Sequence, residues 1–99
     1  MTIQTFEDGG KATLALEGRL DVKSAPQLQT ELQKVLHHTT ELVFDMQGVN
    51  YISSSGFRVL LLAQKQMNRQ GKMRLIHVND AVMQIIAITG FEEVFYVSR

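Results

Sequence analysis

The feature that most constrains the fold is the alternation of short apolar runs with helix-like segments in the second half of the chain. Residues 42–46 and 73–78 are nearly continuous apolar runs of strand length. A helical pattern follows each run, from about residue 55 or 56 to 70 and from 80 to 89. Strands that alternate with helices through short connections are typical of α/β domains with a largely parallel sheet. The run 42–46 is expected to be covered on both faces, because it lacks apolar–polar alternation.

The first half of the chain predicts a β-hairpin followed by a helix. Residues 3–6 and 12–17 alternate apolar and polar side chains around Asp8-Gly9-Gly10, whose residues tolerate the positive φ of a tight turn. The segment 24–27 reads as an N-cap serine, an early proline and a capping-box glutamine, and the helix is expected to end near residues 37–38. The connections expected as loops are 18–23 and 48–54.

Local signals also predict where the later elements end. Gly71 is expected to cap the second helix in the left-handed conformation, and Gly90 to end the third helix. Asn79 is expected to N-cap the third helix. Residues 91–97 predict a final strand or extended segment, so the expected order is ββαβαβαβ.

Composition predicts one domain, 1–99, and excludes several classes of protein. The chain has 99 residues, 44% of them hydrophobic, and no cysteine, so disulfides and thiolate sites are ruled out. Ten basic and ten acidic residues give zero formal charge without a basic run, so no nucleic-acid partner is expected. Neither an export signal nor an apolar stretch of membrane-spanning length is present, which predicts a cytoplasmic protein without membrane insertion.

Catalytic and metal sites are not expected. Ser55 does not lie in a Gly-x-Ser-x-Gly elbow, no carboxylate partner for a histidine is visible in the sequence, and no P-loop is present. The histidine pair His37-His38 is interpreted as the exposed end of a helix rather than a metal site. His77 alternates with Met73 and Leu75, which predicts a hydrogen-bonded, partly buried side chain on their face of the strand. A small hydrolase remains a distant alternative, and no cofactor or metal is expected.

The segment 51–56 is the candidate functional site, because it places three hydroxyls where a loop meets the N-terminus of an apolar helix. Free backbone N–H groups and the positive end of the helix dipole favour an anion there, so a phosphate on a serine can be held. The alternative interpretation is that one serine only caps the helix.

The second helix has an expected core stripe and an outer face of mixed character. The core stripe consists of Gly56, Val59, Leu60, Ala63 and Met67. On the outer face two leucines lie beside two cations, which predicts a small docking patch unless these leucines are isolated surface residues. The patch consists of Arg58, Leu61, Leu62 and Lys65.

Three blocks of sequence resemble the STAS family of anti-sigma factor antagonists. The segment 43–57 is similar to the family's pattern of a strand ending in Asp followed by Asp-Ser-Ser-Gly-aliphatic. The segment 18–21 is similar to Gly-x-Leu-Asp after the hairpin, and 89–95 to the closing Thr-Gly-Leu-x-x-x-Phe. The resemblance implies a STAS-like α/β domain with a mixed, mostly parallel sheet, an N-terminal hairpin and packed helices.

The resemblance also implies a mechanism without enzymatic activity. In this bacterial family, the serine before the glycine, here Ser55, is phosphorylated by an anti-sigma factor that is also a serine kinase of the histidine-kinase-like ATPase type. A PP2C-type phosphatase reverses the modification. The unphosphorylated antagonist binds the kinase, and phosphorylation releases it; the free antagonist is expected to be a monomer.

Some assignments within the family remain open. Ser53 stands where the family has Asp, so Ser54 and Ser53 are secondary candidates for phosphorylation. The alternative function is a non-phosphorylated STAS scaffold subunit of a transport complex. Asp21 and Asp45 match family aspartates near the switch. The expected partner-binding residues are Asp21, Asp45, Ser54, Gly56, Arg58, Leu61, Leu62 and Lys65.

Overall fold

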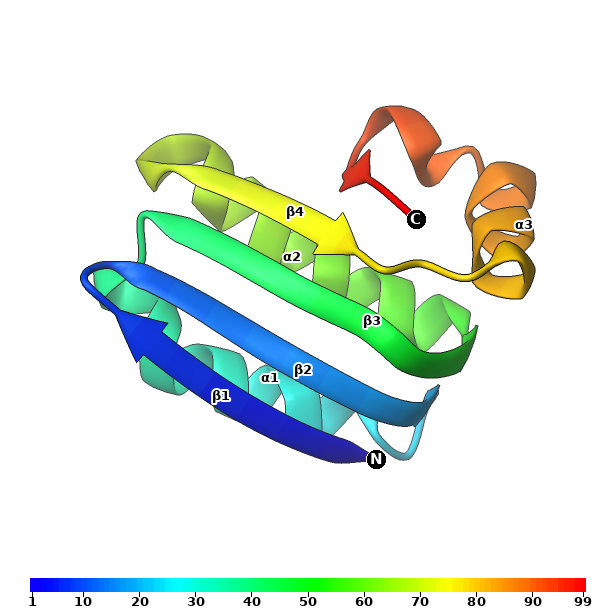
Figure 1. Ribbon diagram of the computed structural model, residues 1–99, viewed down its shortest axis with the longest axis horizontal. Helices are drawn as coiled ribbons and strands as arrows, with labels where there is room; N and C mark the ends of the chain where they lie inside the picture. The colour runs from blue at the N-terminus through cyan, green and yellow to red at the C-terminus, as the bar shows by residue number, and fades with distance from the viewer.

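The computed structural model describes all residues from 1 to 99 and contains one five-stranded sheet in the order β1-β2-β3-β4-β5 (Figure 1). β1 runs antiparallel to β2, and the remaining neighbours are parallel. The predicted α/β fold with a mostly parallel sheet after the hairpin is confirmed. The strands are β1 (Thr2–Asp8), β2 (Lys11–Leu20), β3 (Glu41–Ile52), β4 (Lys72–Ile76) and β5 (Tyr96–Val97).

The N-terminal hairpin forms where the sequence predicts it. Asp8 pairs with Lys11 across a two-residue turn, in which Gly9 and Gly10 have φ of 55° and 91°. Two consecutive positive φ values are what a type I′ turn requires, and glycine adopts them without a Cβ penalty.

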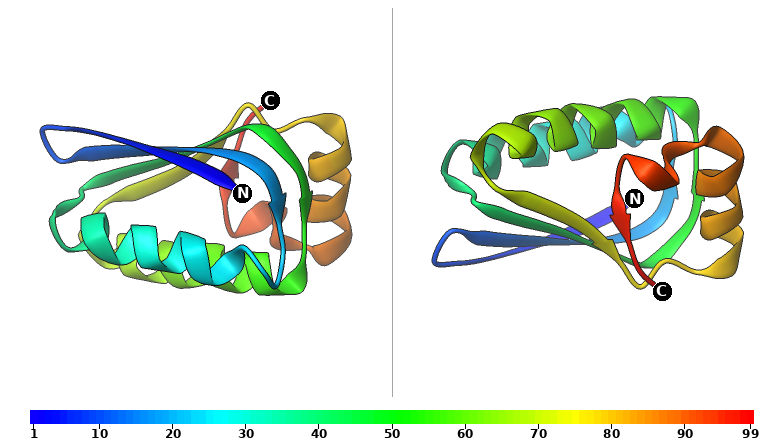
Figure 2. Two further views of the ribbon diagram at one scale, coloured as in Figure 1. Left: turned by 90° about the horizontal axis from the view of Figure 1, so that it is seen from below. Right: turned by 90° about the horizontal axis from the view of Figure 1, so that it is seen from above.

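β2 and β3 are both longer than the sequence pattern indicates. Residues 18–20 and 48–52 were predicted as loops, but they form the last pairs of the parallel ladder, including Gly18 with Val49 and Leu20 with Ile52. Register shifts interrupt this ladder, and the paired ends curl away from the rest of the sheet (Figure 2). The loop prediction was wrong because glycine weakens the local strand signal, whereas pairing between distant segments provides the hydrogen bonds.

The two longer helices, α1 (Ala25–Val35) and α2 (Ser54–Gln70), cover the same face of the sheet (Figure 2). α3 (Asp80–Thr89) packs beside the curled end of β3. Phe44 points toward α1 and α2 and is fully buried, whereas Val43 and Asp45 point to the open face. The prediction that this strand is covered on both faces was therefore wrong. Val43 is buried between its cross-strand neighbours Thr13 and Arg74 instead.

The start of α1 is held differently from the predicted capping box. The Ser24 hydroxyl donates to the Arg19 carbonyl at 2.7 Å and accepts from the Asp21 N–H at 2.9 Å, so it does not cap the helix. The carboxylate of Asp21 accepts from the Ser24 N–H at 3.2 Å. Gln27 donates to the carbonyl of Met1 rather than closing a capping box.

The other helix ends divide between confirmed and wrong predictions. Asn79 caps α3 by accepting from the Val82 N–H at 2.9 Å, and Gly90 ends it in the left-handed region at φ 78°, as predicted. Gly71 follows α2 but has φ 172°, so the predicted left-handed cap was wrong. Glycine is required there because a Cβ would overlap the backbone of Thr40.

The predicted final strand is mostly not a strand. Residues 91–93 form a 3₁₀ turn, and only Tyr96–Val97 pair with β4. The aromatic residues of this segment pack inward: the rings of Phe57 and Phe91 are 5.0 Å apart, and those of Phe91 and Phe95 are 6.1 Å apart.

Two histidines have carboxylate partners that the sequence did not reveal. His38 Nε2 lies 2.6 Å from a carboxylate oxygen of Glu7, and His77 Nδ1 lies 2.9 Å from Asp45 Oδ1. His77 has φ of 58°, which turns its side chain to the open face of the sheet and leaves it 52% exposed. The predicted hydrogen bond is present, but the prediction that His77 lies partly buried on the face of Met73 was wrong.

The sheet and the helices enclose one apolar core, which extends from β2 to the C-terminal Phe95. No helix is long and apolar enough to cross a membrane. No three metal-ligating side chains come together in a group that could hold a metal ion.

Candidate functional site

Ser53 holds the chain at the point where β3 becomes α2. Its N–H donates to the carbonyl of Leu20 at 2.8 Å, and its carbonyl accepts from the Phe57 N–H at 2.9 Å. Its hydroxyl accepts from the Gly56 N–H at 3.3 Å. Ser53 is therefore the N-cap of α2, and the interpretation that one serine caps the helix applies to this residue. An aspartate would perform the same N-cap role, so Ser53 preserves the cap at the position where the STAS pattern has Asp.

Ser54 and Ser55 are the first two residues of α2, and neither acts as its cap. Ser54 is exposed and Ser55 is half-buried. Their backbone N–H groups lie in the first helical turn, where no preceding helical carbonyl is available, and the positive end of the helix dipole is at the same place. A negative charge on either hydroxyl would be stabilised by this environment.

Gly56 brings α2 close to the end of β2. A Cβ on Gly56 would lie 2.7 Å from both Cγ and the carbonyl oxygen of Leu20, and 3.1 Å from Ile52. Gly56 is buried beneath the first turn. In this structure its contacts are with the protein's own strands β2 and β3.

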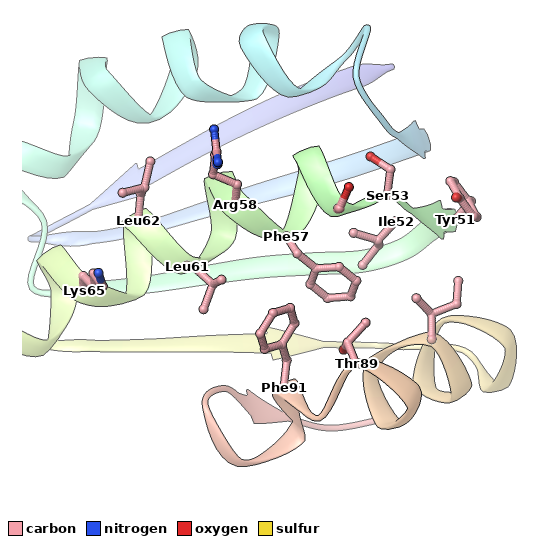
Figure 3. Close-up of a pocket in the computed structure, with 12 residues that line it drawn as sticks. Tyr51, Ile52, Ser53, Phe57, Arg58, Leu61, Leu62, Lys65, Thr89 and Phe91 are labelled. Carbon is pink, nitrogen blue, oxygen red and sulfur yellow. The ribbon is translucent and has the colours of Figure 1, made fainter.

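Two grooves flank the N-terminal half of α2. The α1–α2 groove, of about 400 Å³, is lined by Val22, Ala25, Pro26, Gln29, Ser54, Ser55, Arg58 and Val59. The α2–α3 groove, of about 700 Å³, is lined by Tyr51, Ile52, Ser53, Ser54, Phe57, Arg58, Leu61, Leu62, Lys65, Ile85, Thr89 and Phe91 (Figure 3). Ser55 faces the first groove, and Ser54 and Arg58 border both.

The expected outer face of the second helix is found on α2, and its core stripe is buried as predicted. Leu62 is 52% exposed and Leu61 is half-buried in the α2–α3 groove. Arg58 and Lys65 are exposed beside them, and no carboxylate lines this groove. Arg58 points toward α1 in Figure 3, on the side of the α1–α2 groove, which Ser55 also lines. The surface combines apolar side chains with positive charge.

The two predicted aspartates lie in different places. Asp21 begins the connection to α1, beside the α1–α2 groove. The backbone N–H of Ser24 hydrogen-bonds the Asp21 carboxylate and lowers its pKa below the usual 3.8, although partial desolvation acts in the opposite direction. Asp45 lies on the open face of the sheet and hydrogen-bonds His77. The structure therefore does not bring Asp45 to the serines.

The sequence prediction missed the far wall of the α2–α3 groove. Ile85, Thr89 and Phe91 form this wall, and Tyr51 lies at its end beneath the guanidinium of Arg19, 4.3 Å from the ring centre. A local signal was available, because the segment that forms α3 is apolar on more sides than one buried stripe needs.

Sequence comparison places most of the chain within one family. Residues 3–97 match the family model described as "Mlab, STAS domain". BtrV of Bordetella bronchiseptica, named as an anti-sigma factor antagonist, is 34% identical over 92 residues, which cover 91% of this chain and 79% of BtrV. The anti-sigma-B factor antagonist of Bacillus subtilis is 26% identical over 84% of this chain and 77% of its own length. These relatives are named as regulators rather than enzymes.

Structural comparison gives the same fold. SpoIIAA of Bacillus, an anti-sigma factor antagonist, aligns in its unphosphorylated form with a TM-score of 0.83 and 15% identity, over 99% of this chain and 89% of SpoIIAA. Its phosphorylated form aligns with a TM-score of 0.75 and 14% identity, over 99% and 92% of the two chains. The family model and the similarity to BtrV show that the chain belongs to the STAS domain family, in which these relatives are anti-sigma factor antagonists.

Proposed function

We propose that this chain is an anti-sigma factor antagonist that switches partners according to the phosphorylation of Ser55. The similarity to BtrV over most of both chains carries the functional assignment. The position of Ser55, in the first turn of α2 and immediately before the buried Gly56, supports the choice of residue.

The hydrogen bonds around the three serines favour Ser55 and Ser54 over Ser53. The Ser53 hydroxyl accepts the N-cap bond from Gly56, so modification there would disturb the start of the helix. Ser55 lines the α1–α2 groove together with Arg58, which lies three residues further along the helix. Side chains three residues apart are neighbours on a helix surface, so Arg58 can reach a phosphate on Ser55.

The unphosphorylated protein binds its partner through the surface around α2, and phosphorylation weakens binding through local charge. A phosphoserine adds about −1.5 to −2 charges at pH 7. A partner surface shaped for a neutral hydroxyl would have to desolvate this group, at a cost of several kcal/mol unless it supplied cations. The first-turn N–H groups stabilise the same phosphate in the free protein. SpoIIAA keeps this fold in both forms, which supports a switch without refolding.

The partners in this proposal are an anti-sigma factor that is also a serine kinase of the histidine-kinase-like ATPase type, and a PP2C-type phosphatase. The protein itself is a cytoplasmic, single-domain regulator without catalytic activity, a cofactor or a nucleic-acid partner, and it is a monomer when free. Asp21, beside the α1–α2 groove, helps to position the site for the incoming kinase.

Phosphopeptide mapping after incubation with candidate anti-sigma kinases and ATP tests the proposal. We expect modification of Ser55 in the wild type and none in Ser55→Ala, with Ser54→Ala as the matched control that remains modified. Full phosphorylation of Ser55→Ala would overturn the residue assignment. Absence of phosphorylation and of binding with every such kinase would instead favour the transport-complex scaffold.

A further inference from the structure

The middle of the chain carries positive charge and has no acidic residue of its own. Residues 46–79 contain no Asp or Glu, although the whole chain has ten acidic and ten basic residues. The same segment contains the cations Arg58, Lys65, Arg69, Lys72 and Arg74. The three on α2 are exposed and take part in none of the ion pairs of the structure. α2 is therefore a basic surface on a protein of zero formal charge.

The same surface of α2 is apolar between its cations. Arg58, Leu61, Leu62 and Lys65 occupy positions i, i+3, i+4 and i+7, which lie on one face of a helix. Leu61 extends into the α2–α3 groove, toward the side on which Phe91 lies (Figure 3). The groove thus has an apolar floor, and Arg58 and Lys65 border its α2 side.

α3 extends this apolar surface beyond the groove. Only Val82 and Ile86 of α3 are buried, whereas Ile85 is half-buried in the groove wall and Ile88 is 87% exposed. A helix that is apolar on most sides is usually covered. Small-molecule sites bury roughly 70–90% of their ligand, and exposed apolar shoulders such as Ile88 and Leu62 suit a larger, elongated occupant better.

We propose that the α2–α3 groove binds an acidic amphipathic helix of the protein partner. Its apolar stripe lies between Leu61 and Phe91, and two carboxylates pair with Arg58 and Lys65. These cations are seven residues apart, a rise of about 10.5 Å along α2, so the partner's carboxylates are also about seven residues apart. The inference rests on the proposed antagonist function and adds the chemistry of the partner segment.

Two synthetic helical peptides test this directly. Both have the same leucine stripe; one has two glutamates seven residues apart beside the stripe, and the other has lysines there. Titration of ¹⁵N-labelled protein to millimolar peptide should shift amide signals of α2, α3 and residues 91–93, with affinity about tenfold higher for the glutamate peptide. Lys65→Glu should abolish or reverse this preference. Lys72→Glu, the same charge change outside the groove, should leave it intact.

Several outcomes would overturn the inference. They are no shifts with millimolar peptide, equal affinity for both peptides, or shifts confined to the α1–α2 groove or the open sheet face. Binding of palmitate or of a DNA duplex at physiological salt, without binding of the glutamate peptide, would assign the surface to a different ligand class. If an anti-sigma kinase binds while both peptides fail to bind, the inference about the partner helix is wrong and the proposed function stands. If the glutamate peptide binds in the groove while no anti-sigma kinase binds, the proposed function is wrong and the chemistry inferred for the groove stands.

Discussion

Replacing Ser53 tests the capping role that this residue has in the structure, at the position where the family pattern has Asp. Loss of an N-cap costs about 0.5–2 kcal/mol. The 3.3 Å distance from the Ser53 hydroxyl to the Gly56 nitrogen is longer than an ordinary hydrogen bond. The stability lost in Ser53→Ala should therefore lie in the lower half of this range, at about 0.5–1 kcal/mol. For a domain of this size that loss lowers Tm by roughly 2–8 °C.

Ser53→Asp should instead stabilise the protein and raise its Tm. A carboxylate at the N-cap accepts the same bond and interacts with the positive end of the helix dipole, which adds about 0.3–1 kcal/mol. Thermal melts followed by circular dichroism at one scan rate would compare both variants with Ser54→Ala, a neighbouring serine outside the cap. If Ser53→Ala had the same Tm as the Ser54→Ala control, or if Ser53→Asp had a lower Tm than Ser53→Ala, the capping assignment would be wrong.

Three further predictions concern the support of the site. Gly56→Ala should destabilise the protein by about 1–2 kcal/mol, because the clash with Leu20 exceeds the gain in helix propensity; an unchanged urea midpoint would refute the close approach. Asp21→Asn should lower Tm at neutral pH. Because the folded-state pKa of Asp21 is below the usual 3.8, this difference should shrink as pH falls below that value, and a Tm difference that persists in acid would contradict it. Asn79→Ala removes the α3 cap and a bond to the Val49 carbonyl, so it should cost about 1–2 kcal/mol and speed amide exchange in α3, whereas unchanged exchange would show that other contacts hold the helix.

The parts of the fold that could be predicted from sequence depend on neighbours in the chain. The hairpin turn at Gly9-Gly10 and the ends of α3 at Asn79 and Gly90 need only local backbone chemistry, and all were predicted correctly. The core stripe of α2 was also predictable, because helical spacing determines which side chains share a face.

The errors arose where distant segments determine the local structure. The final pairs of β2 with β3 form between residues about thirty positions apart, so neither segment alone indicates a strand. Gly71 is needed because the backbone of Thr40 approaches it, rather than for a positive φ. The resemblance implied Ser55 as the switch residue, which stays a prediction. The groove wall at Phe91 could not be predicted, because it depends on the packing of α3 and the C-terminal segment.

The affinity of an anti-sigma kinase for phosphorylated and unphosphorylated protein tests the central proposal most directly. Calorimetric titration should show binding of the unphosphorylated chain and of Ser55→Ala. Binding of the phosphorylated chain and of Ser55→Asp should be weaker by about a hundredfold or more, while all four melt at similar temperatures. Equal affinity of the two phosphorylation states would contradict the switch, and a large fall in Tm on phosphorylation would contradict its proposed local mechanism.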